Sequence, residues 1–382
     1  MSVIPEPAEN ASTPAAGFIG RIPVGNIWLL MLYASDLFRV GGIQNMRVEE
    51  NLDELPDLVA EILAHAVEKR SRRNLNLGYR SREAVINRVR GRIDVLATER
   101  RQLLARGLVA CHFDELTVDT PRNRFVRAAL ESISRIVRRK DIAHRCRSFA
   151  NSMKAVGVSG EAPTRAQMST DYFGRNDADD RLMVAAAKLA FELALPTEAV
   201  GMNILPTPER EETWVRRLFE RAIGGFYSVV LRSQGWNVRC GGTMGWRIEQ
   251  QTAGIKKILP TMRTDIVLDH SSTERRIVID TKFTSIVTSG WYREETLRSG
   301  YLYQIYSYLR SQAGNGDALA DSATGLLLHP VVGNMVDEMV LIQGHHIRFA
   351  TVDLSAAAVD IRAQLLRFCD PIPPVFADSW KS

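Results

Sequence analysis

The chain has 382 residues, 45% of them hydrophobic, which is enough for a full core and predicts about two domains. No apolar run approaches the ~20 residues that a membrane-spanning helix needs. The start, MSVIPEPAENASTPAAG, lacks the regions of a secretory signal. The four cysteines are far apart and form no C-x-x-C motif, so we expect neither a zinc site nor a disulfide framework, and a cytoplasmic location.

The formal net charge of +5 is unevenly distributed. Between Ala66 and Ala150 there are 21 Lys or Arg against 9 Asp or Glu, a net charge of +12. Such asymmetry suggests that one domain binds a polyanion. The alternative is a solvated surface in a protein that is rich in arginine throughout.

The first half of the chain predicts a disordered tail and then a basic α+β domain. Residues 1–17 are rich in Pro, Ala and Ser, a composition typical of disorder. Residues 18–165 begin with an apolar helix, NIWLLMLYASDLF, for which Asn26 is a candidate N-cap. A second helix, ELPDLVAEILAHAVEKRSRR, is expected to pack with His65 on its buried side. Strand-like segments and a basic amphipathic helix, RNRFVRAALESISRIVRRK, complete this domain.

A change of pattern near residue 206 predicts a second domain. Residues 166–205 combine a helix, DADDRLMVAAAKLAFELAL, with a linker that contains Pro and Gly. Residues 206–382 then begin with a long helix, followed by the strand candidates WNVRC, TDIVLDH and RRIVIDTKF. A helix, LRSGYLYQIYSYLRSQA, and the strands GLLLHPVV and HHIRFATVDL follow. This alternation predicts an α/β core.

Charged residues stand at the ends of two predicted strands. Asp265 opens one strand, Asp280 closes the next, and the polar turn SSTE joins the two as a hairpin. We therefore expect both carboxylates at the same rim of the sheet, with Lys282 on the same face as Asp280 because strand periodicity is two. Two carboxylates and the intervening carbonyl of Thr281 form a hard-oxygen site suited to Mg²⁺, for which Mn²⁺ can substitute. A lysine there can orient an attacking water or offset phosphate charge.

Each of these features also has a purely structural interpretation. Asp280 and Lys282 can be an ion pair at the end of a strand. Gln304 and Tyr308, four apart on one helix face, can simply pack on the sheet. Glu220 points away from the apolar side of its helix, where it can form a surface ion pair with a neighbouring arginine.

Taken together, these residues resemble the core of the PD-(D/E)xK nuclease superfamily. Glu220, Asp265, Asp280-x-Lys282 and Gln304-x-x-x-Tyr308 follow its order of helix, strand, strand and helix. The trailing Gln and Tyr are similar to the RecB-like branch, and Thr264 stands where the superfamily's name has proline. The resemblance implies a restriction-endonuclease-like domain in which Asp265, Asp280 and Thr281 hold the metal. Lys282 and Glu220 would assist catalysis, and Gln304 and Tyr308 would brace the site or touch DNA.

More of the chain resembles one family, McrC, the nuclease subunit of McrBC-type restriction systems. RIPVGNIWLLMLYA and FDELTVDTPRNRFVRAAL are similar to its N-terminal segments, and DTKF with LYQIYSYL to its nuclease end. The resemblance implies a Mg²⁺-dependent endodeoxyribonuclease that is a subunit of a 5-methylcytosine-specific restriction system. A AAA+ GTPase, the McrB-like partner, would activate it. No G-x-x-x-x-G-K-[ST] motif occurs, so we expect the partner, and not this chain, to bind the nucleotide.

The sequence leaves two other functions open. One is a stand-alone RecB-like DNA repair nuclease, and the other is a non-catalytic DNA-binding scaffold that activates a motor partner. In each case the basic segment is expected to contact DNA or the partner. Its candidate contact residues are Arg88, Arg90, Arg92, Arg100 and Arg101.

Overall fold

Two compact units make up the chain, Met1–Leu55 with Leu195–Ser382, and Pro56–Ala194. The structure, a computed structural model, describes residues 18–19, 22–40, 51–164, 168, 178–202, 208–288, 296–331 and 334–371. The predicted tail, residues 1–17, lies outside the described residues. Within the described ranges no helix is both long and apolar enough to cross a membrane.

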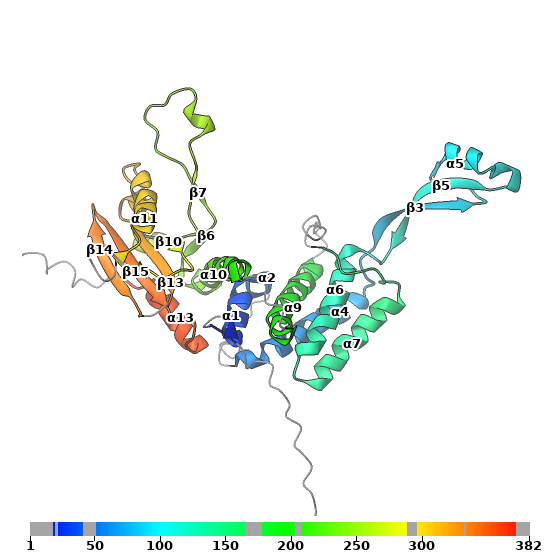
Figure 1. The fold of residues 1–382 in the computed structure, drawn as a ribbon, viewed down its shortest axis with the longest axis horizontal. Coiled ribbons are helices and arrows are strands. Elements are labelled where there is room, and N and C mark those ends of the chain that lie inside the picture. Colours follow the sequence, from blue (N-terminus) through cyan, green and yellow to red (C-terminus); the bar gives the residue numbers. More distant parts are fainter. Residues whose placement is uncertain are drawn as a thin grey trace, which may run out of the picture. The chain divides into compact units, whose positions relative to one another are not determined.

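A mixed six-stranded sheet organises the first unit (Figure 1). Its strands run in the order β14-β15-β13-β10-β9-β6. Their bounds are Asn237–Cys240 (β6), Ile266–His270 (β9), Arg275–Thr281 (β10), Thr324–Pro330 (β13), Asp337–Ile342 (β14) and His345–Val352 (β15). β10, β13 and β15 are parallel, whereas β9 pairs antiparallel with β10 as the predicted hairpin requires. The α/β prediction for this part of the chain is confirmed, although β14 was not predicted.

Helices cover the sheet of the first unit. They are α1 (Val24–Ala34), α2 (Asp36–Val40), α10 (Pro208–Val230), α11 (Ser299–Gln312), α12 (Ala318–Asp321) and α13 (Ala358–Arg367). α11 connects the parallel strands β10 and β13 and packs on them, and Ile305 and Leu309 join a buried cluster with Val278 and Leu327. The hydroxyl of Tyr227 on α10 donates to the carbonyl of Leu365 on α13, 2.9 Å away.

Short two-stranded sheets also belong to this unit. They are β1 (Phe18–Ile19) with β2 (Ile22–Pro23), β7 (Thr243–Met244) with β8 (Met262–Arg263), and β11 (Val287–Thr288) with β12 (Thr296–Leu297).

The first helix, α1, is buried on nearly every face and packs along α10. Asn26 is not its N-cap: the cap is Pro23, and Asn26 lies inside the helix. Its amide Nδ2 instead donates to the carbonyls of Leu354 and Ala356, at 2.8 and 2.9 Å. A buried amide must find partners, and this one finds them more than 300 residues away in sequence.

The second unit is a helical body with a β-hairpin. Its helices are α4 (Leu55–Ser71), α5 (Val95–Arg100), α6 (Pro121–Ile136), α7 (Lys140–Ala155) and α9 (Ala178–Met202), and its strands are β3 (Gly78–Ile86), β4 (Arg92–Ile93) and β5 (Val109–Thr117). Three helices meet at Asp180 of α9, which is 1% exposed and pairs with Arg70 and Arg122. Figure 1 shows the hairpin of β3 and β5, with α5 at its far end.

The structure departs from the predicted boundaries. The domain predicted over 18–165 does not include α1, because the apolar surface of α1 is buried against α10 in the other unit. The linker predicted at the end of 166–205 is helical up to Met202, so Pro196 does not end α9. His65 is exposed, because α4 buries the side that carries Val59 and Leu63.

Candidate active site

The predicted carboxylates meet at one rim of the six-stranded sheet. Ile266 pairs with Ile279, so Asp265, just before β9, lies opposite Asp280 near the end of β10. The backbone N–H of Thr281 donates to Oδ2 of Asp265 at 2.7 Å, and its hydroxyl donates to the same oxygen at 2.8 Å. The hairpin therefore positions one aspartate by hydrogen bonds from the strand that carries the other.

Asp280 is the most buried member of the site. It is 1% exposed, and neither carboxylate oxygen has a hydrogen-bond partner among the described residues. The Lys282 ammonium lies 2.7 Å from Oδ2 and forms an ion pair with it. Burial raises the pKa of Asp280 to about 6, against the opposing effect of Lys282, and the charge of Asp265 raises it further. A buried, under-satisfied carboxylate at a rim is typical of a functional group.

Lys282 follows β10 directly and is held between two groups. Its ammonium pairs with Asp280 and also lies 5.2 Å from the centroid of the Tyr301 ring. The structural interpretation of Asp280 and Lys282 as an ion pair is thus correct as a contact. It does not account for the burial of carboxylate oxygens that receive no hydrogen bond.

Glu220 belongs to the same electrostatic environment. The residue is exposed on α10, yet partial desolvation and the charge of Asp265 raise the pKa of its carboxyl, while Arg263, Arg216 and Lys282 lower it. Such mutual influence indicates that Glu220 lies near the rim and is not only a surface ion pair.

Gln304 and Tyr308 do share one face of α11, as their spacing predicts. The Gln304 amide Nε2 donates to the Tyr308 hydroxyl at 2.5 Å, and that hydroxyl donates to the carbonyl of Arg263 at 2.7 Å. Arg263 ends β8, two residues before Asp265. The pair therefore fixes the backbone that leads into the first aspartate, which favours a bracing role.

Sequence reasoning missed Tyr301 and His329. Tyr301 precedes Gln304 by three and Tyr308 by seven residues, so helical spacing could have placed it on the same face. His329 is buried on β13 and bonds to the carbonyl of Thr284 through Nδ1, and burial lowers its pKa to about 4. Tyr301 and His329 rings lie 5.8 Å apart. No local pattern distinguishes such a histidine from an ordinary strand residue.

The donor set fits a divalent cation with oxygen ligands. Asp280 offers two carboxylate oxygens without hydrogen bonds. Both bonds from Thr281 go to Oδ2 of Asp265, so they leave Oδ1 of Asp265 available as a ligand. No group of three or more His, Cys, Asp or Glu able to hold a metal occurs in the described part of the chain. A site of two carboxylates and a carbonyl suits Mg²⁺, which keeps several waters and needs few protein ligands, but not zinc.

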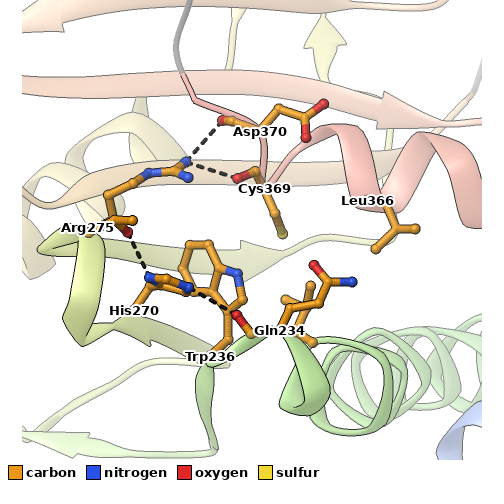
Figure 2. A pocket seen from close by; sticks show the side chains of 9 residues that line it. Gln234, Trp236, His270, Arg275, Leu366, Cys369 and Asp370 are labelled. Carbon is orange, nitrogen blue, oxygen red and sulfur yellow. Dashed lines mark hydrogen bonds between the residues drawn. The ribbon is translucent and has the colours of Figure 1, made fainter.

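A separate pocket of about 390 Å³ lies at the opposite end of the β9–β10 hairpin (Figure 2). Arg275 is 5.3 Å from the Trp236 ring and donates to the carbonyls of Cys369 and Asp370, both at 2.9 Å. His270 bonds to the carbonyl of Gln234 through Nε2 at 3.0 Å. The bonds of Arg275 thus join the start of β10 to the segment that follows α13.

The predicted basic residues are exposed in the second unit. Arg88 and Arg90 follow β3, Arg92 begins β4, and Arg100 and Arg101 end α5. The Arg90 guanidinium stacks 4.4 Å above the Phe113 ring.

Comparisons with known proteins find a family model, a curated relative and a solved structure that resemble the chain. A family model, the McrBC 5-methylcytosine restriction system component, matches residues 2–172. The chain is 27% identical over 357 residues to the type IV methyl-directed restriction enzyme EcoKMcrBC of Escherichia coli K12, covering 91% of this chain and 97% of that relative. It is also similar, at 14% identity and a TM-score of 0.41, to a chain in the refined half-complex of Thermococcus gammatolerans McrB AAA+ hexamers with bound McrC, covering 91% of this chain and 76% of that one. By these matches the chain is similar to components of the McrBC 5-methylcytosine restriction system and resembles McrC-type proteins.

Proposed function

We propose that the chain is the metal-dependent DNA endonuclease subunit of a 5-methylcytosine-specific restriction system and cleaves DNA when a AAA+ GTPase partner activates it. The observation that carries the proposal is the rim. There a buried carboxylate without hydrogen bonds, Asp280, stands opposite Asp265 and 2.7 Å from the Lys282 ammonium. Similarity to the McrBC component family and to the E. coli relative supports the restriction context.

Asp265, Asp280 and the carbonyl of Thr281 would hold Mg²⁺ or Mn²⁺. When bound, such a cation would act as a Lewis acid that activates water and offsets phosphate charge. The bonds from Thr281 to Asp265 keep that carboxylate oriented toward the rim. This orientation matters because a loose ligand lowers both metal affinity and rate.

Lys282 would place the attacking water or stabilise charge that develops on the phosphate. Its position between Asp280 and the Tyr301 ring restricts the ammonium to the rim, and preorganised charge of this kind is the main source of rate in phosphoryl transfer. Glu220, whose pKa is raised by partial desolvation and by the charge of Asp265, would act as the base that accepts a proton from water. Gln304 and Tyr308 brace the approach to Asp265.

The test uses the purified full-length chain with Mg²⁺, on methylated and unmethylated plasmid, with and without the partner GTPase and GTP. The proposal expects cleavage of methylated plasmid only in the complete mixture. Rapid cleavage of unmethylated plasmid by the chain alone would establish the stand-alone repair nuclease instead. Stimulated GTP hydrolysis without any cleavage, in Mg²⁺ or Mn²⁺, would establish the non-catalytic scaffold.

A further inference from the structure

An arm leaves the sheet beside the candidate active site. We define the arm as residues 243–263, which begin with β7 and end with β8. Thr243 pairs with Arg263 and Met244 with Met262 at its base. The same ladder continues below it, because Gly241 N–H donates to the carbonyl of Asp265 at 2.7 Å. The arm is thus a direct extension of the rim that carries Asp265 (Figure 1).

The base of the arm is fastened to the site. Met262 joins the buried cluster that contains Tyr308. Gln312, at the end of α11, donates to the carbonyl of Gly245 at 2.9 Å, and Arg247 donates to the carbonyl of Gly314 at 3.2 Å. Further out, the Trp246 indole N–H donates to the carbonyl of Pro260 at 2.6 Å and ties the two legs together. These bonds position the arm relative to the rim.

The arm is strongly basic and exposed. Its charged residues are Arg247, Lys256, Lys257, Arg263 and, as the one acid, Glu249. All four cations are exposed, and none forms an ion pair with a carboxylate of the described chain. Lys256 and Lys257 are adjacent in a chain otherwise dominated by arginine. Cations that neutralise no internal charge are available to an external anion.

Exposed apolar side chains accompany these cations. Ile258, next to the lysine pair, is 76% exposed, and Ile248 and Trp246 are 47% and 40% exposed. Together they give the arm exposed apolar surface beside its cations, which is available to a contact with a partner molecule. A phosphate backbone with apolar sugar edges satisfies both kinds of side chain.

We infer that this arm binds the phosphate backbone of duplex DNA next to the Asp265 and Asp280 rim, with Lys256 and Lys257 as its principal contacts. The inference rests on the proposed function for the position of the phosphate that is cleaved. A duplex whose scissile phosphate lies at the rim extends past the elements that border the rim, and the arm borders it on the Asp265 side. Phosphate contacts of this kind fix register and carry no sequence information.

The test measures binding of a 30-base-pair duplex to the full-length chain in EDTA, by fluorescence anisotropy at several salt concentrations. Lys256→Ala with Lys257→Ala should weaken binding at least about tenfold and reduce the slope of log K against log salt by about 2, since each released phosphate contact contributes ~0.9. Lys256→Arg with Lys257→Arg keeps the charge and should keep the slope. Arg232→Ala, an exposed cation at the far end of the sheet, is the distal control.

An unchanged slope in the double alanine variant, or no duplex binding by the wild-type chain at low salt, would overturn the inference. So would a loss of affinity for the GTPase partner with DNA binding intact, since the arm would then be a protein contact. The assay needs no cleavage, so its failure is separable from that of the proposed function. If Asp280→Asn abolishes cleavage while the lysine variants bind DNA normally, the nuclease assignment is supported and the inference about the arm is wrong.

Discussion

At the scale of single residues, Asp280 is placed where its charge is disfavoured. Burial raises its pKa from 3.8 to about 6, and at ~1.4 kcal/mol per pKa unit the charged form costs on the order of 3 kcal/mol at neutral pH. The pKa stays raised even with the Lys282 ammonium 2.7 Å from Oδ2, so this ion pair does not fully offset the cost of burial. A cation bound at the rim, as proposed above, would offset more of it.

The raised pKa of Asp280 predicts how metal affinity depends on pH. Below pH about 6 the metal-free carboxyl takes up a proton, and a neutral acid is a poor ligand. The apparent Kd for Mn²⁺ should therefore rise about tenfold per pH unit below 6 and level off above it, as measured by calorimetry or by electron paramagnetic resonance.

The proton also affects folding without metal. Because the folded-state pKa lies above the ordinary value, protonated Asp280 stabilises the fold, and this contribution is lost as the pH rises through about 6.

Equal Mn²⁺ affinity at pH 5 and pH 7 would contradict the assignment of Asp280 as a ligand. Glu338→Gln, an exposed carboxylate of β14, should leave the profile unchanged.

At the scale of elements, the crossing of α1 and α10 depends on glycine. Gly225 lies in the middle of α10, where glycine is about 1 kcal/mol less favourable than alanine. A Cβ at this position would overlap the carbonyl oxygen of Tyr33 on α1. Close approach of two backbones thus outweighs helix propensity here.

Gly225→Ala should lower the free energy of unfolding by more than about 2 kcal/mol, because the clash is with backbone. Gly224→Ala is the matched control: its Cβ would meet the Cys240 Sγ at 2.9 Å, and that side chain can turn away. We expect the control to change the free energy of unfolding by less than about 1 kcal/mol in urea titrations. Equal effects of the two substitutions would show that the helix crossing is not close.

How much the sequence predicts follows from the range of each interaction. The meeting of Asp265 and Asp280 was predictable, because a short turn and strand periodicity determine it. The pairing of Gln304 with Tyr308 follows from helical spacing. The role of Asn26 was not predictable, because its partners are the carbonyls of Leu354 and Ala356.

The unit boundaries were missed for the same reason. The apolar composition of a helix near the start of a chain predicts that the helix is buried. It does not predict which element the helix packs against. α1 contacts α10, nearly two hundred residues later, and thereby joins the unit that contains the rim. Charge asymmetry correctly located the basic segment, since charge is a property of composition and needs no partner to be seen.

In the whole molecule, two surfaces are proposed to contact DNA, the arm and the basic hairpin. Replacing the hairpin set with glutamine in the full-length chain should weaken duplex binding and lower the salt slope, if phosphates are its target. The set is Arg88, Arg90, Arg92, Arg100 and Arg101. Anisotropy with the same duplex measures it. An unchanged slope together with lost GTPase binding would assign the hairpin to the partner.

Single-turnover cleavage of methylated DNA by the assembled complex tests whether the rim of Asp265, Asp280 and Lys282 cleaves DNA. Asp280→Asn and Lys282→Ala should each reduce the rate at least about 100-fold while partner binding and GTP hydrolysis persist. Glu338→Gln and Arg232→Ala, at exposed positions that the rim does not use, should cleave at the wild-type rate. Cleavage by either rim variant at the wild-type rate would contradict the account.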